Sequence, residues 1–259
     1  DIFNHDPDMP SASAFVQQRS KIKPEAFRDI LAGFTEKITR QSNRLRLLAV
    51  DGSDIQIATN PYDEGTYFPG INGQKPYSLI HLNALYDLEQ HIYVDSRIQG
   101  RMSWNEHMAL QEMVDKSDIR KALVIADRGY ESYNNMAHIQ EKGWFFLIRV
   151  KDGKTGIKDG LLLPEENEFD VDICLKLVRK QTNQIKELLK DKNIYRCIPH
   201  STSFDYLPEK TRKADPVTFY ELKFRVVRFE IGSDSYETVL TNLDKDTYPA
   251  TELKRLYAA

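Results

Sequence analysis

Residues 122–130 run Ala122-Leu123-Val124-Ile125-Ala126-Asp127-Arg128-Gly129-Tyr130, a short apolar segment that ends at a charged turn. Five consecutive apolar residues before a polar turn are typical of a strand covered on both faces. Ser132 then offers the N-cap of a helix that stops at Gly143, and residues 144–150 are apolar almost throughout. A buried strand, a helix and a second buried strand in this order predict parallel strands in one sheet.

The stretch before this pattern predicts three more strands, arranged as an antiparallel meander. Residues 45–50 form an apolar run that stops at Asp51-Gly52-Ser53-Asp54, which predicts a buried strand ending in a polar turn. Two further runs, 76–86 and 91–95, have strand character, and the connection of residues 87–90 has the length of a hairpin. This order is that of the ribonuclease-H-like α/β fold, a mixed five-stranded sheet flanked by helices.

The remaining segments predict further helices and an insertion around this core. Residues 24–38 place apolar side chains on one helical face, and Ser103 with Glu106 three residues later has the pattern of a capping box. We expect four parts: an N-terminal helical segment (1–44), the first part of the core (45–150), a β-rich insertion (151–235) and a return to the core that ends in a truncated helix (236–259).

The composition limits the function without deciding it. The chain has 259 residues, 29% of them charged, and a formal net charge of −3, which excludes a uniformly basic surface that binds nucleic acid unaided. Carboxylates gathered around a metal would lower the net charge without repelling DNA once metal is bound. Two cysteines are too few for a disulfide framework, and no apolar run approaches the ~18 residues of a membrane span. We therefore expect a soluble, cytoplasmic protein.

Asp51 and Asp127 each follow an apolar strand, and they are the candidate metal ligands. A hard cation such as Mg²⁺ prefers carboxylate oxygens held on rigid backbone, and the ends of adjacent strands supply that arrangement. Taken singly, an aspartate after a strand is more often a turn or helix-cap residue. For Asp54 and Asp95, near the same strand ends, we expect a turn or surface role.

The sequence around the two candidate ligands resembles the DDE transposases of the insertion-sequence-four family. Asp51-Gly52-Ser53 and Asp127-Arg128-Gly129-Tyr130 match the family's motifs around two of its three catalytic carboxylates. Thr241-Asn242-Leu243 and residues 253–257 resemble the strand and helix before the family's signature, which is Tyr, two residues, Arg, three residues, Glu, six residues and Lys. Tyr257 stands at the Tyr of that signature. The resemblance covers nearly the whole chain from about Ser11.

The resemblance implies an enzyme that cleaves DNA and transfers strands at transposon ends. It implies that Asp51, Asp127 and a glutamate together hold two Mg²⁺ or Mn²⁺ ions, and that a homodimer acts on paired transposon ends and target DNA. The signature's Arg would be the residue after Ala259, so its Arg, catalytic Glu and Lys lie outside this sequence. Glu252 precedes Tyr257 and does not match the catalytic Glu. We expect this fragment to be inactive alone.

Several other residues are candidates for DNA contact. Arg128 follows the second aspartate and could lie near phosphate, whereas Tyr130 of the same motif could equally be a packing residue. Lys176, Arg179 and Lys180 make the insertion locally basic, which suits phosphate contacts and equally suits a solvated face. Two other functions stay open: a ribonuclease-H-like nuclease that cuts without transposition, and an inactive transposase remnant that binds DNA or a protein.

Overall fold

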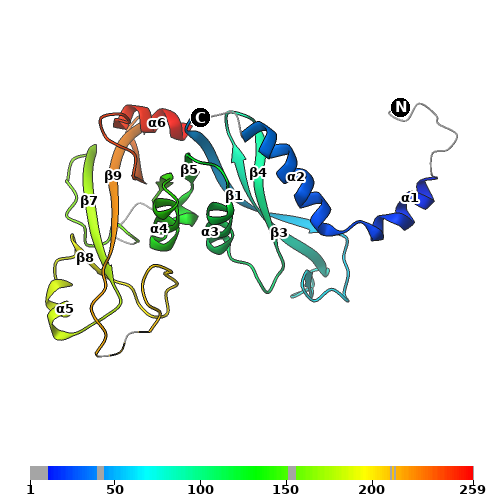
Figure 1. Ribbon diagram of the computed structural model, residues 1–259, viewed down its shortest axis with the longest axis horizontal. Helices are drawn as coiled ribbons and strands as arrows, with labels where there is room; N and C mark the ends of the chain where they lie inside the picture. The colour runs from blue at the N-terminus through cyan, green and yellow to red at the C-terminus, as the bar shows by residue number, and fades with distance from the viewer. Residues whose placement is uncertain (1–10, 40–43, 151–155, 211, 213, 259) are drawn as a thin grey trace. The chain divides into compact units, whose positions relative to one another are not determined.

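A computed structural model of the chain describes residues 11–39, 44–150, 156–210, 212 and 214–258 (Figure 1). The chain forms two compact units, residues 1–42 and 43–259. Within the described part, the first unit contains α1 (Ala12–Gln18), the short 3-10 helix η1 (Arg19–Lys21) and α2 (Pro24–Thr39). The helix predicted from residue 24 is confirmed, and its apolar side chains Phe27, Ile30 and Phe34 are more than half exposed.

The second unit is built on one mixed sheet with helices on both faces (Figure 1). Its strands are β1 (Arg46–Ile57), β2 (Tyr67–Phe68), β3 (Tyr77–Asp87), β4 (Ile92–Gln99), β5 (Ala122–Ala126), β6 (Phe145–Arg149), β7 (Phe169–Val178), β8 (Tyr195–Cys197), β9 (Tyr220–Gly232) and β10 (Ser235–Thr241). Its helices are α3 (Glu106–Lys116), η2 (Arg128–Tyr130), α4 (Tyr133–Glu141), α5 (Asn183–Leu188) and α6 (Ala250–Ala258).

The strand pairing confirms the predicted meander and its parallel extension. β3 pairs antiparallel with both β1 and β4, and β1, β5 and β6 are parallel neighbours. The sheet is larger than the five strands expected, because it has ten strands in the order β2-β3-β1-β5-β6-β10-β9-β7-β8, with β4 also on β3. The strands of the segment treated as an insertion, β7, β8 and β9, therefore continue the sheet of the core.

The polar turn predicted at residues 51–54 is wrong, because β1 continues through these residues to Ile57. Each of them pairs with β3, from Asp51 opposite Ala84 to Ile57 opposite Ser78. Backbone hydrogen bonds form this ladder whatever the side chains are, and a polar strand is stable where its side chains reach solvent. Asp51 consequently lies in the middle of a strand and not at its end.

The start of α3 also differs from the prediction. The N-cap is Asn105, whose side chain accepts a hydrogen bond from the Met108 amide, and Ser103 instead bonds with Gly100. Both residue types are good caps, and the competing turn at Gly100 occupies the Ser103 hydroxyl. Glu106 is therefore the first residue of the helix, with its side chain available for other contacts.

Two apolar clusters cover the two faces of the sheet. The larger one packs α3 and α4 against one face, with Leu48 and Val50 of β1 and Val124 of β5 in its centre. The smaller one packs Leu253 and Leu256 of α6 against the opposite face. Side chains of one strand alternate between these clusters, as expected for strands covered on both faces.

Candidate metal centre

Asp51 and Asp127 come to neighbouring positions on adjacent parallel strands. The β1–β5 register pairs Arg46 with Ala122 and continues to Ala49 opposite Ile125. Asp51 stands on β1 two residues after Ala49, and Asp127 stands two residues after Ile125, one residue beyond the end of β5. Both predicted ligands therefore follow the last pair of this ladder by two residues, where paired strands lie about 4.8 Å apart. Both residues are exposed.

Because side chains alternate along each strand, both aspartates belong to the same face of the sheet. Leu47 of β1 and Leu123 of β5 pack in the cluster under α6, and each stands an even number of residues before its aspartate. Residues an even number apart on a strand share a face, so Asp51 and Asp127 lie on the α6 side. The Asp127 backbone remains extended, with φ −78° and ψ 178°, and its carboxylate accepts a hydrogen bond from the Gly129 amide at 2.7 Å.

Tyr130, the last residue of the predicted motif, lies close to this pair. Its side chain is 1% exposed and packs in the α3–α4 cluster, so the packing role is confirmed. Burial raises the pKa of Tyr130 far above its usual value, and the negative charges of Glu106, Asp51 and Asp127 raise it further. The hydroxyl therefore keeps its proton and is influenced by three carboxylates.

Glu106 contacts β3 in a way that the sequence did not indicate. Its Oε1 lies 3.0 Å from Nε2 of His81, and Nδ1 of His81 lies 2.7 Å from Oδ1 of Asp54. His81 is 4% exposed, and its ring packs on Trp104 with a centroid distance of 4.6 Å. The pairing of β1 with β3 brings Asp54 opposite His81, a contact that no local pattern predicts.

The donor set suits a hard divalent cation. Asp51 and Asp127 offer carboxylate oxygens, the ligands that Mg²⁺ and Mn²⁺ prefer. Among residues 11–39, 44–150, 156–210, 212 and 214–258, no three His, Cys, Asp or Glu side chains are already gathered around one point at metal-binding distance. The two aspartates form one part of a site, and further ligands have to come from water, substrate or another carboxylate.

The end of α6 lies on the same side of the sheet as the two aspartates. Arg149, the last residue of β6, hydrogen-bonds with Glu237 of β10, and this contact raises the pKa of Arg149, with Tyr257 of α6 adding to the effect. The β5–β6 register ends with Ala126 paired to Ile148, and Asp127 and Arg149 are the next residues of the two chains. Tyr257 thus acts at the end of β6, the strand next to β5.

The four basic candidates differ in their surroundings. Arg128 is exposed next to Asp127, and Lys176 is partly exposed with its Nζ 3.8 Å from Oε1 of Glu221. Arg179 is 4% exposed, and its guanidinium donates to the carbonyls of Pro199, Thr202 and Phe204. Lys180 is also buried and donates to the Asp215 carbonyl. Arg179 and Lys180 thus hold loops of the insertion together.

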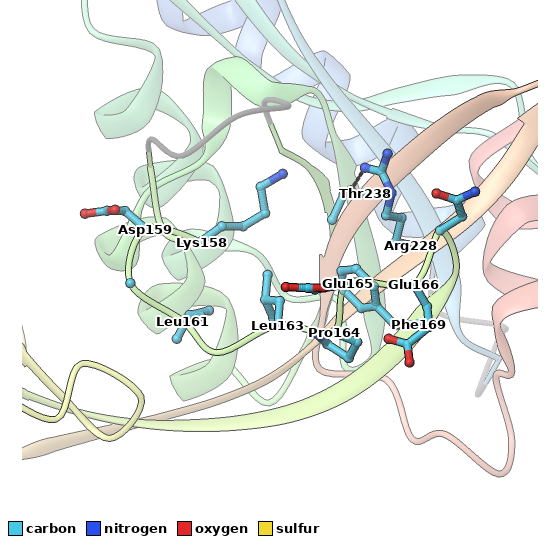
Figure 2. A pocket seen from close by; sticks show the side chains of 12 residues that line it. Lys158, Asp159, Leu161, Leu163, Pro164, Glu165, Glu166, Phe169, Arg228 and Thr238 are labelled. Carbon is cyan, nitrogen blue, oxygen red and sulfur yellow. Dashed lines mark hydrogen bonds between the residues drawn. The ribbon is translucent and has the colours of Figure 1, made fainter.

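A cavity of about 720 Å³ lies away from the aspartates, between the loop of residues 158–167 and strands β7, β9 and β10 (Figure 2). Its lining mixes acidic and basic side chains, including Lys158, Glu165, Glu166 and Arg228. The guanidinium of Arg228 donates to Oγ1 of Thr238 at 3.1 Å. This cavity contains neither Asp51 nor Asp127, and its mixed charge favours no single ligand.

The fold is a mixed α/β domain in which two aspartates follow the paired stretch of neighbouring parallel strands. The model of the transposase DDE domain family matches residues 42–259. This match covers most of the chain, and the chain belongs to the DDE transposase domain family. Members of this family are enzymes of DNA cleavage and strand transfer, and they generally use divalent metal ions.

One solved structure with a similar chain is piggyBac transposase in a synaptic complex with hairpin DNA, determined by cryo-electron microscopy. The sequence identity is 10%, the TM-score is 0.36, and the match covers 82% of this chain and 38% of that chain. No curated protein sequence matches the chain. None of the helices in the described part of the chain is long and apolar enough to cross a membrane.

Proposed function

We propose that this chain carries two of the three catalytic carboxylates of a transposase that cleaves DNA and transfers strands at transposon ends. The observation that supports the proposal is the β1–β5 ladder, whose last pair, Ala49 and Ile125, stands two residues before the two aspartates. We further propose a ribonuclease-H-like core and membership of the insertion-sequence-four group, because Asp127-Arg128-Gly129-Tyr130 and Tyr257 match that group's motifs.

In this proposal, Asp51 and Asp127 bind the divalent cations from the α6 face of the sheet. The bound cations would supply activation of water or of a DNA 3′-hydroxyl, and charge stabilisation for the departing oxygen at phosphorus. We propose that the aspartates fix the position of the reacting phosphate through the rigid sheet and that Arg128, which is exposed, contacts the DNA backbone. No protein nucleophile is required.

The third carboxylate is proposed to come from the continuation of α6. The effect of Tyr257 on Arg149, at the end of the strand next to β5, supports a helix that continues toward Asp127. We propose that Arg follows Ala259 and that the catalytic Glu stands four residues later in the parent protein. The DNA partners, the homodimer on paired ends and the cytoplasmic location are proposed with it. The gene sequence after Ala259 tests this directly.

The decisive experiment replaces each aspartate in the parent protein. Asp51→Asn and Asp127→Asn are isosteric, and we expect either to abolish Mg²⁺-dependent cleavage of transposon-end DNA, because each removes a charged metal ligand. DNA binding, measured by fluorescence anisotropy, should be nearly unchanged. The exposed Asp118 provides a matched control, and Asp118→Asn should cleave normally. Retained cleavage in Asp51→Asn or Asp127→Asn would remove that residue from the site.

A further inference from the structure

Strand β4 forms an open edge of the sheet in the described part of the chain. It pairs with β3 from Ile92 opposite Asp87 to Gln99 opposite His81, and its other side pairs with no described strand. An unpaired edge presents backbone N–H and C=O groups that can pair with another chain, and proteins commonly keep such edges very short. β4 has 8 residues, which is long enough to pair with a further strand.

The backbone of Ser96 faces this open edge. In an antiparallel pair, residues alternate between those whose N–H and C=O groups bond to the neighbouring strand and those whose groups point away from it. The Ser96 N–H donates to Oδ1 of Asp95 at 2.7 Å, and the Ser96 carbonyl accepts from Nη1 of Arg97 at 2.8 Å. Because both groups bond to side chains of β4 itself, they indicate a residue whose backbone points away from β3.

The charges on either side of Ser96 are complementary to themselves under a two-fold axis. If two copies of β4 pair antiparallel with Ser96 opposite Ser96, Asp95 of each copy stands opposite Arg97 of the other. Side chains directly opposite each other have Cβ atoms about 4.5–5.5 Å apart, where opposite charges stabilise the pair and like charges destabilise it. Within one copy, Oδ1 of Asp95 lies 2.6 Å from Nη1 of Arg97, so the two side chains share one face of the sheet.

Two exposed apolar side chains of β4 also favour a second copy at this edge. Tyr93 and Ile98 are 56% and 67% exposed, and they stand opposite Tyr86 and Leu82 of β3. Leu85 packs in the α3–α4 cluster, so Tyr86 and Leu82, at odd distances from it, lie on the other face. A second copy of β4 would extend that face and cover part of the two exposed side chains.

We propose that β4 is a homodimer interface, in which the sheets of two copies of this chain join through antiparallel β4 strands centred on Ser96. The inference rests on the proposed function only for the homodimer to which it gives an interface. On pairing, Ser96 exchanges its backbone hydrogen bonds with Ser96 of the second copy. Asp95 and Arg97 then leave the Ser96 backbone of their own chain and contact the opposite charges of the second copy.

The alternative role of Asp95 and Arg97 is to protect the edge from pairing. Charged side chains on edge strands serve this purpose in many proteins, and here they bond to the backbone groups of Ser96. A protected edge does not need exposed apolar side chains, which favours the interface. Protection predicts a chain that stays monomeric at every concentration, whereas the interface predicts a dimer whose affinity follows the charges at positions 95 and 97.

The experiment measures self-association of the complete 259-residue chain by sedimentation equilibrium, at concentrations from about 1 μM to about 1 mM. The unmodified chain should form a dimer. D95R and R97D each place like charges opposite each other twice in that dimer, so we expect each to weaken dimerisation by roughly 10-fold or more. The double variant D95R/R97D restores opposite charges and should dimerise like the unmodified chain.

D118R and R120D are the matched controls, because Asp118 and Arg120 are exposed, two residues apart and outside β4. Both should dimerise like the unmodified chain. A second measurement needs no variant: hydrogen–deuterium exchange in residues 92–99 should slow as the concentration rises, because the Ser96 N–H gains a backbone partner. This measurement decides if circular dichroism shows that D95R or R97D does not fold.

Several results would overturn the interface. They are a chain that stays monomeric, exchange that does not depend on concentration, single variants that dimerise like the unmodified chain, and a double variant that dimerises as weakly as the single ones. In each case the catalytic part of the proposed function stands, because cleavage by Asp51→Asn and Asp127→Asn tests it separately. If those aspartate variants still cleave DNA and the dimer follows the charges of β4, the interface stands and the catalytic assignment fails.

Discussion

His138 shows how one side chain connects three parts of the second unit. Nδ1 lies 2.9 Å from Oδ1 of Asp115 on α3, and Nε2 lies 2.8 Å from Oδ2 of Asp205 in the insertion. The ring is 7% exposed on α4 and donates from both nitrogens only when both carry protons. Asn134 also donates to Asp205, at 3.0 Å. These charge-assisted contacts fix the insertion on the helices behind the candidate metal centre.

Asp205 gives this cluster a predictable pH dependence. Burial would raise its pKa, but hydrogen bonds from Asn134 and His138 outweigh burial and hold the pKa below the usual 3.8. A lowered folded-state pKa contributes stability above the unfolded-state value, and this contribution is lost as the pH falls through the folded-state value.

We therefore expect Asp205→Asn to lower the free energy of unfolding by about 1 kcal/mol near neutral pH, a modest value because Asp205 is half exposed. Urea denaturation should show this difference from the unmodified chain shrinking as the pH falls below 3.8. The exposed Asp118→Asn should show no such difference at any pH. A loss of stability in Asp205→Asn that stays constant down to the lowest pH would contradict this interpretation.

Arg225 joins elements that are far apart in the sequence. It lies on β9 with 3% exposure, and its Nη2 is 2.6 Å from Oδ2 of Asp170 on β7. Its Nη1 donates to the carbonyls of Leu243 and Tyr248, in the loop before α6. One buried guanidinium thus connects the strands of the insertion to the helix whose continuation is proposed to carry the third carboxylate.

Arg225→Met should destabilise the second unit by about 1.5–3 kcal/mol, because it removes the hydrogen bonds of the guanidinium and leaves the partly buried Asp170 carboxylate with Lys245, whose Nζ lies 3.7 Å from Oδ2. The measurement is urea denaturation followed by circular dichroism. Lys223→Met on the same strand is the control, since Lys223 is exposed and should change stability little. A loss below about 1 kcal/mol in Arg225→Met would show that Asp170 finds another partner or is readily hydrated.

At the scale of the whole molecule, the division of the chain into two compact units leads to a testable prediction. A chain that begins at residue 43 should fold and bind Mn²⁺ like the complete chain, because the sheet and both apolar clusters belong to the second unit. Its melting temperature should stay within about 2 °C of that of the complete chain, as expected for independent units. A larger decrease would mean that the helical segment stabilises the sheet.

Deletion of residues 156–232 is the contrasting variant. β9 pairs with β10 on one side and β7 on the other, and it supplies Val226, Val227 and Phe229 to the two clusters. Removing it would expose an apolar strand edge and part of the core. We expect that variant to be insoluble or unfolded, although the sequence of the deleted segment predicts an insertion.

Most of the elements could be predicted because their signals are local. The strands around residues 46–50, 122–126 and 145–149 are apolar runs, and α2 shows helical spacing. The residues at 51–54 could not be placed correctly, since their strand structure depends on pairing with β3, which lies more than twenty residues away. Local polarity predicts a turn there, and cross-strand hydrogen bonding overrides it.

The candidate site also combines residues that the sequence indicates with contacts that only the folded chain forms. The chemistry of Asp51 and Asp127 is visible in the chain, since each is a carboxylate directly after an apolar run and their motifs resemble a known family. Glu106 could not be recognised, because its neighbours His81 and Gly52 come from β3 and β1. The burial of Arg179 could not be predicted from the sequence either, because the three backbone carbonyls that accept its hydrogen bonds come from a loop that is distant in the sequence.

Residue types and their spacing were enough to identify the strands, the two aspartates and the family, because these depend on hydrophobic periodicity and on short motifs. Folding in three dimensions paired β1 with β5 just before the two aspartates, joined the insertion to the core sheet and brought Glu106 beside β1. The physical reason is that pairing and burial are properties of contacts between distant segments. A linear pattern records which groups are present, and the packed sheet determines which of them meet.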